Sequence, residues 1–359
     1  MSAGHKEKQM SIDPYLEDLE RRLDPEVEEP LLASWKEFCD GRFTGELFSP
    51  RRSRQAPPGI AWPEVAINRT LEDLDAMMLQ QFAAASGTLA KGGGGMLAVR
   101  ANYGTGILPS VFGAPIYVMD EKLATLPTST PYAGGGADAM RRLLACGEPD
   151  LDAGYGARVF AAGEAFRKRM QAYPKVSRYV NIYHPDLQGP MDVTELLWGS
   201  SIFIDLLDDP GLGHAMLERV TGTYARFMRR WFEVAPQPGA YARHWGMLHR
   251  GAIMLRNDSA MNFSPEMFDT FFSPYDRQLL QALGGGAVHF CGRGSHYIGS
   301  LAAYEGLTAV QLSQPQYNDM ETVFRNTVDK GIALLDLSRK TAEEALRAGR
   351  SLHGRVHSW

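Results

Sequence analysis

A histidine and a cysteine two residues apart, His289 and Cys291, are the side chains of this chain best suited to chemistry. They end the apolar segment 287–290 and precede a glycine-rich turn, Gly292-Arg-Gly294. The segment is typical of a buried strand, in which side chains two residues apart point to the same face, so the imidazole and the thiol are expected side by side. Such a pair can bind Zn²⁺, act as a nucleophile with its base, or simply be buried.

The spacing favours a metal site slightly over plain burial. A nucleophilic pair is the weakest of the three interpretations, because a catalytic thiol generally takes its base from elsewhere in the fold. Zinc needs at least three protein ligands, and no cysteine follows Cys291 in the chain. His357 is therefore the best candidate for the third metal ligand, and the weaker candidates are His353, Asp258 and Asp336.

Short apolar segments alternate with long amphipathic ones, and these are the elements that must position the pair. This alternation predicts a parallel sheet with helical crossovers, and about eight strands in this length favours a (β/α)₈ TIM barrel. We predict an α/β protein in which an N-terminal helical extension, residues 1–60, precedes a barrel formed by residues 61–359. The last strand has no helix after it, and a predicted helix at 14–39 is the candidate to cover that gap. The predicted strands are 65–67, 96–101, 179–183, 253–256, 287–290, 309–312, 332–335 and 355–357.

The carboxyl ends of the strands hold the active site in such barrels, and polar residues occupy most of these ends here. We predict that Tyr183, Asp186 and Asp258 are catalytic, since each lies at or just after the end of a predicted strand. The loop 102–106 offers backbone N–H groups suited to a carboxylate or phosphate. The predicted substrate-binding residues are Asn102, Tyr103, Gly104, Gly106, Gln188 and Gln311.

Composition narrows the class of protein. The chain has 359 residues, 44% of them hydrophobic and 22% charged, with a formal net charge of -5, as in ordinary globular enzymes. The chain has no block of Lys and Arg that would indicate a nucleic-acid or membrane partner. It also has no apolar segment long enough to span a membrane. The three cysteines are widely scattered rather than arranged as a disulfide framework. We therefore expect a cytoplasmic enzyme that acts on a small molecule.

Three groups of segments carry a family resemblance. They are 186–190 with 197–199 and 206–210, then 257–260 with 264–268 and 274–275, and finally 289–292. These segments resemble the uroporphyrinogen decarboxylase superfamily, which includes decarboxylases and corrinoid-dependent methyltransferases. The resemblance implies a (β/α)₈ barrel over residues 60–359. It also implies that His289 and Cys291 bind zinc, which activates a thiol acceptor to attack a methyl group on cobalamin held by a partner protein. By analogy with the superfamily, a homodimer is expected.

Two motifs of that superfamily are missing from this chain. The decarboxylase loop Arg-Gln-Ala-Gly-Arg-Tyr has no counterpart, because Arg54-Gln55-Ala56 is followed by two prolines. The later cysteine ligand of the methyltransferases is also missing, which leaves His357 in its place. The leading hypothesis is a zinc-dependent methyltransferase. The alternatives are a metal-free decarboxylase, a carbon–carbon lyase that uses Asp258 or His357 as acid or base, and a non-catalytic barrel that binds a corrinoid or another ligand.

Overall fold

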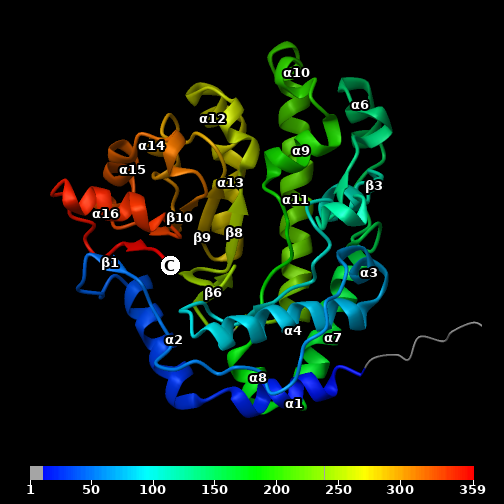
Figure 1. Cartoon of the computed structure of the whole chain (residues 1–359). Helices are drawn as coiled ribbons and strands as arrows, with labels where there is room; N and C mark the ends of the chain where they lie inside the picture. Colours follow the sequence, from blue (N-terminus) through cyan, green and yellow to red (C-terminus); the bar gives the residue numbers. More distant parts are fainter. Residues whose placement is uncertain (1–10, 238) are drawn as a thin grey trace, which may run out of the picture.

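Two parallel sheets form the centre of the molecule. The computed structural model describes residues 11–237 and 239–359 (Figure 1). The larger sheet has six strands in the order β1-β12-β11-β10-β9-β8, and the smaller one pairs β2 with β5. The bounds are β1 Leu47–Phe48, β2 Ala98–Val99, β5 Asn181–Ile182, β8 Ile253–Arg256, β9 Gly286–Phe290, β10 Leu307–Leu312, β11 Ala333–Leu335 and β12 Val356–His357.

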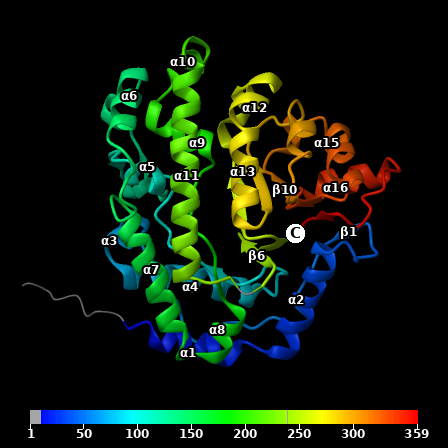
Figure 2. The same ribbon diagram turned by 180° about the vertical axis from the view of Figure 1, so that it is seen from behind.

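Helices surround these sheets, and the described residues also form two separate antiparallel hairpins. The longest helix, α11, runs beside α13 (Figure 2). The helices are α1 Asp13–Arg22, α2 Pro25–Cys39, α3 Ile67–Glu72, α4 Leu74–Lys91, α5 Ile107–Val111, α6 Ala137–Ala145, α7 Gly156–Met170, α8 Pro174–Tyr179, α9 Pro190–Trp198, α10 Ile202–Asp208, α11 Pro210–Val234, α12 Pro265–Phe271, α13 Ser273–Leu283, α14 Ile298–Leu301, α15 Met320–Asn326 and α16 Arg339–Arg347. The antiparallel hairpins are β3 Ile116–Tyr117 with β4 Thr128–Ser129, and β6 Tyr241–His244 with β7 Met247–Arg250.

The predicted α/β class with parallel strands and helical crossovers is confirmed. The parallel strands and their helical crossovers are compatible with a TIM-like fold. No ladder joins the six-stranded sheet to the β2–β5 pair within the described part of the chain, so the closure of the predicted eight-stranded barrel is not shown there. No helix in residues 11–237 and 239–359 combines the length and apolar character needed to cross a membrane.

Seven of the eight predicted strands coincide with observed ones, and the exception is the predicted strand 65–67. That segment leads into α3, and the prediction was wrong because a short β-branched run does not by itself distinguish a strand from the start of a helix. The eighth parallel strand is β1, in which Phe48 is the register partner of His357. It lies within the predicted N-terminal extension, so this extension contributes an edge strand to the sheet. With two residues, β1 is too short for any periodicity to reveal.

Helix α2 covers the end of the sheet that has no following helix, as expected. The Trp35 ring lies 4.7 Å from the His357 ring, and Phe38 stacks on Phe48 with ring centroids 4.6 Å apart. Asp24 caps α2 by accepting a hydrogen bond from the Glu26 N–H, which satisfies one of the unpaired donors of the first turn. The N-terminal helices are therefore part of the packed molecule.

The inner face of the large sheet has two rows of side chains, and these rows position the site. In the first row, Met254, Ala287, Ala309 and Ala333 are register partners on β8, β9, β10 and β11. The alanines leave room on this face, and the hairpin β6–β7 fills it by packing Met247 and Leu248 into the same core cluster. The second row, one step toward the carboxyl ends, is polar on three strands and consists of Arg256, His289, Gln311 and Leu335.

Candidate metal centre

Asp258, His289 and Cys291 bring one oxygen, one nitrogen and one sulfur atom together at the carboxyl end of the sheet. Their ligand atoms all lie within 4.8 Å of one another. The Cys291 Sγ is 3.5 Å from Nε2 of His289, and Oδ1 of Asp258 is 3.0 Å from the same nitrogen. The carboxylate and the sulfur therefore flank one ring nitrogen, as two ligands of a shared metal ion would.

Strand register explains why these residues meet. Arg256 on β8 is the register partner of His289 on β9, so Asp258, two residues later, follows at the level of Cys291. The 3-10 helix η3 (Asp258–Asn262) begins at Asp258. Asp192 on α9 holds this turn, because its carboxylate accepts hydrogen bonds from the N–H of Asp258 at 2.7 Å and of Ser259 at 3.0 Å. Burial and the nearby Asp258 charge raise the pKa of Asp192 to about 8.

Gln311 fixes which nitrogen of His289 faces the other two groups. Its side-chain oxygen hydrogen-bonds Nδ1 of His289, and its amide nitrogen lies 3.5 Å from the Asp336 carboxylate. The amide can donate to that carboxylate only through its nitrogen, so its oxygen must accept from Nδ1–H of the imidazole. The lone pair of the neutral ring is then on Nε2, the tautomer that binds a metal between Asp258 and Cys291.

The electrostatics of the three groups suit a cation. Burial favours a neutral imidazole, but the Asp258 carboxylate and Cys291 outweigh burial and raise the pKa of His289 to about 9. Burial also favours protonation of Asp258, yet its contacts with His289 and Cys291 hold the pKa of this carboxyl below its ordinary value. Without a metal the site thus holds a proton on His289, and a metal ion would take the place of that proton.

The donor set of one oxygen, one nitrogen and one sulfur atom is one that zinc accepts. A tetrahedral ion with ordinary Zn–S and Zn–N bond lengths separates its ligands by about 3.3–3.7 Å. The sulfur–nitrogen distance of 3.5 Å lies in this range, whereas the oxygen–nitrogen distance of 3.0 Å is shorter and is that of a direct contact between Asp258 and His289. The Asp258 side chain is 40% exposed, whereas His289 is buried. Oδ1 of Asp258, the oxygen nearest His289, is nevertheless buried, so the exposure belongs to the other atoms of this side chain.

His357 is not a member of this group in the described structure. Its Nδ1 accepts a hydrogen bond from the Asp336 N–H at 3.1 Å, and its ring packs against Trp35 and Trp359. Burial lowers the pKa of His357 to about 3, so the ring is neutral. His357 is thus linked to His289 only through Asp336 and Gln311. His353 lies elsewhere, 3.6 Å from the Asp329 carboxylate.

The predicted catalytic residue Asp186 lies in a buried ion-pair cluster beside the metal-ligand group. Its carboxylate lies 3.3 Å from Nη1 of Arg100 and 3.0 Å from Nη1 of Arg256, and it accepts a hydrogen bond from Gln188 at 3.2 Å. Burial opposes ionisation, but the two guanidinium groups hold the pKa of Asp186 below its ordinary value. An ionised carboxylate with this many partners orients the two arginines. Asn102 completes the cluster by accepting from Nε of Arg100 at 2.9 Å.

The other predicted substrate-binding residues are packed rather than open. Tyr103 is buried against Tyr155, with ring centroids 5.0 Å apart, and burial raises the pKa of Tyr103 to about 12. Gly104 has a positive φ of 73° and is covered by the backbone at Pro127, while Gly106 directly precedes α5. Tyr183, which was predicted to be catalytic, is also buried, with its ring 5.7 Å from the Arg100 guanidinium.

Three residues near the site were not predicted from the sequence, and they are Asp192, Trp245 and Arg256. Arg256 ends the apolar run Ile-Met-Leu-Arg, so its position at a strand end was a usable signal. Trp245 with Gly246 forms the two-residue turn of the hairpin β6–β7, and its ring lies 5.1 Å from the His289 ring. Asp192 carries no local signal, since only the tertiary structure brings α9 beneath the η3 turn.

No protein-family model matches this chain, and no curated protein matches it. The function is therefore inferred from the geometry of the site, the fold, and the motifs noted in the sequence.

Proposed function

We propose that this protein is a zinc-dependent methyltransferase of the corrinoid type, which moves a methyl group between a cobalamin carried by a partner protein and a thiol acceptor. The metal ligands are Asp258, His289 and Cys291, with Asp258 in the place expected for His357. The convergence of one carboxylate oxygen, one imidazole nitrogen and one sulfur at the carboxyl end of the parallel strands is the observation that supports this function. The resemblance of the segments around 186–210 and 257–292 supports the choice of methyl transfer and of cobalamin as donor.

A zinc ion in this site would bind the acceptor thiol in its open position and lower the thiol pKa, which supplies a thiolate nucleophile at neutral pH. The protein's own residues do the rest. Gln311 and Asp336 hold His289 in the metal-binding tautomer, and Asp192 holds the turn that presents Asp258. The acceptor would approach from the side on which the Asp258 side chain is exposed.

A nucleophilic cysteine is the second candidate, because one feature of the geometry favours it. The imidazole of His289 lies between two groups. The Cys291 thiol contacts its Nε2, and the Gln311 amide oxygen orients its Nδ1. This is the order of groups in a Cys–His pair with an orienting amide. One contact argues against a nucleophilic cysteine. The Asp258 carboxylate contacts Nε2 of His289, the same nitrogen that the thiol contacts. A carboxylate at that position competes with His289 for the proton that the imidazole must accept from the thiol. The metal centre explains all three groups.

Metal content separates the two candidates. We expect about one zinc per chain by mass spectrometry of the freshly purified protein, and loss of the metal in Cys291→Ala and His289→Ala. Cys146→Ala is the matched cysteine control, because Cys146 is exposed on the far end of α6, and it should keep the zinc. His357→Gln should also keep it, since His357 contacts the site only through Asp336.

The activity test uses free methylcobalamin and 2-mercaptoethanol as probes, followed by the absorbance change on demethylation. Zinc-loaded protein should accelerate the reaction, and Cys291→Ala should not. A metal-free protein whose Cys291 is alkylated much faster than Cys146 would support the nucleophilic cysteine instead. A metal-free protein with an unreactive Cys291 would leave neither candidate standing.

A further inference from the structure

Arg256 presents one edge of its guanidinium without any partner. The side chain is 1% exposed, and its Nη1 contacts the Asp186 carboxylate and the Leu187 carbonyl. Its Nε and Nη2 are buried and have no hydrogen-bond acceptor among the described residues. These two nitrogens lie on the same edge of the planar group, and two parallel N–H donors on one edge match the two oxygens of a carboxylate.

The surrounding charges do not balance. Arg100 and Arg256 share the single carboxylate of Asp186. A third buried guanidinium, Arg243, donates from Nη1 to the Asn181 amide oxygen at 3.1 Å, and its Nε has no partner either. A buried cation without a compensating anion is costly. Because Arg256 has to share its one carboxylate partner with Arg100, an anionic ligand at its free edge would be favoured.

Trp245 lies against both Arg256 and His289. Its ring lies 5.0 Å from the Arg256 guanidinium and 5.1 Å from the His289 ring, yet the residue remains 38% exposed. It occupies the first position of a two-residue turn with a φ of 48°, a left-handed conformation that is rare for a bulky residue. Asn or Gly would suit this turn better, so the tryptophan is placed at some cost to the backbone.

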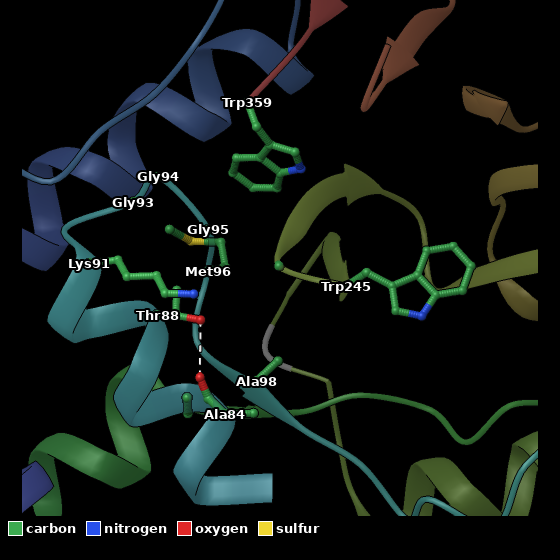
Figure 3. A pocket seen from close by; sticks show the side chains of 12 residues that line it. Ala84, Thr88, Lys91, Gly93, Gly94, Gly95, Met96, Ala98, Trp245 and Trp359 are labelled. Atoms are coloured by element: carbon green, nitrogen blue, oxygen red, sulfur yellow. Dashed lines mark hydrogen bonds between the residues drawn. The ribbon is translucent and has the colours of Figure 1, made fainter. Parts of the chain in front are cut away.

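A pocket lies on the other side of the Trp245 turn. It has a volume of about 340 Å³, and Gly95, Gly246 and Trp359 contribute to its wall. Figure 3 shows Lys91 and Trp245 on opposite sides of this pocket. Trp245 and Gly246 both line it, so the turn that carries the indole has open space on this side.

We propose that the Nε–Nη2 edge of Arg256, whose guanidinium lies beside the indole of Trp245, binds the carboxylate group of the substrate. Because Arg256 and His289 are register partners on neighbouring strands, a small molecule with its carboxylate on Arg256 can place a second functional group at Asp258, His289 and Cys291. The proposal makes the substrate a small carboxylic acid. This assignment of the substrate class rests on the proposed metal centre. The carboxylate subsite itself requires no metal.

The test measures binding of propionate, with propionamide as its uncharged isostere, at constant ionic strength. The readouts are the change in tryptophan fluorescence and the shift in melting temperature. We expect saturable binding of propionate and none of propionamide, and no fluorescence response in Trp245→Phe. Arg256→Lys keeps the charge beside Asp186 but lacks the two-donor edge, so propionate affinity should fall at least about tenfold.

Several outcomes would overturn the proposal. Equal responses to propionate and propionamide in the wild-type protein would show that ordered water occupies the free edge. An unchanged propionate affinity in folded Arg256→Lys would show that the anion binds at another site. Tighter binding of inorganic phosphate than of propionate would exclude a carboxylate subsite. If Arg256→Lys does not fold, the preference of the wild-type protein for propionate over propionamide and the fluorescence of Trp245→Phe still test the proposal.

Repeating the titration after metal removal with phenanthroline, a neutral chelator, separates this proposal from the metal centre. Binding that persists without metal and in Cys291→Ala supports the subsite even if no zinc activity is found. Binding that disappears with the metal would place the carboxylate on the ion, which would refute the subsite and leave the metal centre intact.

Discussion

The side-chain oxygen of Gln311 faces Nδ1 of His289 directly across neighbouring strands β10 and β9, where the two residues are register partners. Parallel pairing thus places an orienting amide opposite the candidate metal ligand, and Asp336 on the next loop fixes the direction of that amide. The histidine is held in the tautomer that offers Nε2 to a metal.

Gln311→Met should weaken zinc binding without unfolding the protein. Methionine has a similar shape but cannot accept the proton of Nδ1, so His289 loses its preferred tautomer and orientation. We expect zinc affinity to fall about 10–100-fold, measured by competition with a chromogenic chelator. Gln237→Ala is a suitable control, because Gln237 also uses its amide, donating to the Ala252 carbonyl, but is not part of the group. Equal zinc affinity in Gln311→Met and wild type would contradict this role.

Asp192→Ala should affect both stability and zinc binding. The carboxylate accepts from two backbone N–H groups and from the Ser259 hydroxyl, and its loss leaves buried donors unpaired at a cost of about 3 kcal/mol. The released η3 turn should also weaken zinc binding, since it carries Asp258. Urea unfolding and the chelator competition measure the two effects. Asp209→Ala, which removes the N-cap of α11, should cost about 1 kcal/mol and leave zinc affinity unchanged.

The sequence predicted the strands that build the site, but it favoured His357 over Asp258 as the third candidate metal ligand. Residues 253–256 were predicted in full and β9 to within one residue, since apolar runs of this length bounded by turns are strong signals. The choice between Asp258 and His357 depends on which strands are neighbours. His357 lies on β12, three positions from β9 in the sheet order, whereas β8 pairs with β9 directly.

Local sequence could not reveal the roles of Trp245 and Asp192. The hairpin that carries Trp245 fits against the sheet only because three successive strands present alanine in one row. That coincidence joins residues far apart in the chain. The position of Asp192 likewise depends on the packing of α9 against η3, which is a tertiary contact with no counterpart in periodicity.

Asp276→Asn should change how stability depends on pH. Burial raises the pKa of Asp276 from 3.8 to about 7, although the Asn257 amide donates to its carboxyl at 2.6 Å. A carboxyl that binds a proton more tightly in the folded state stabilises the fold in acid, and this contribution is lost as pH rises from about 4 to about 7. Asparagine does not titrate, so wild type should lose a few kcal/mol relative to Asp276→Asn over that interval. Urea unfolding of both proteins at pH 5 and pH 8 measures this change in the difference between their free energies of unfolding. A constant difference between the two proteins would contradict the raised pKa.

Trp245→Asn separates function from stability at the hairpin turn. Asn-Gly is the preferred sequence for a two-residue turn in which both residues have positive φ, as Trp245 and Gly246 do here. The gain in turn energy should offset the lost contact with Arg256, so the free energy of unfolding should change by less than about 1 kcal/mol. Carboxylate affinity should nevertheless fall several-fold, because the indole no longer shields the bound carboxylate from water. If the tryptophan served mainly to pack the core, its replacement would instead cost about 3 kcal/mol or more, and urea unfolding beside propionate titration distinguishes the two roles.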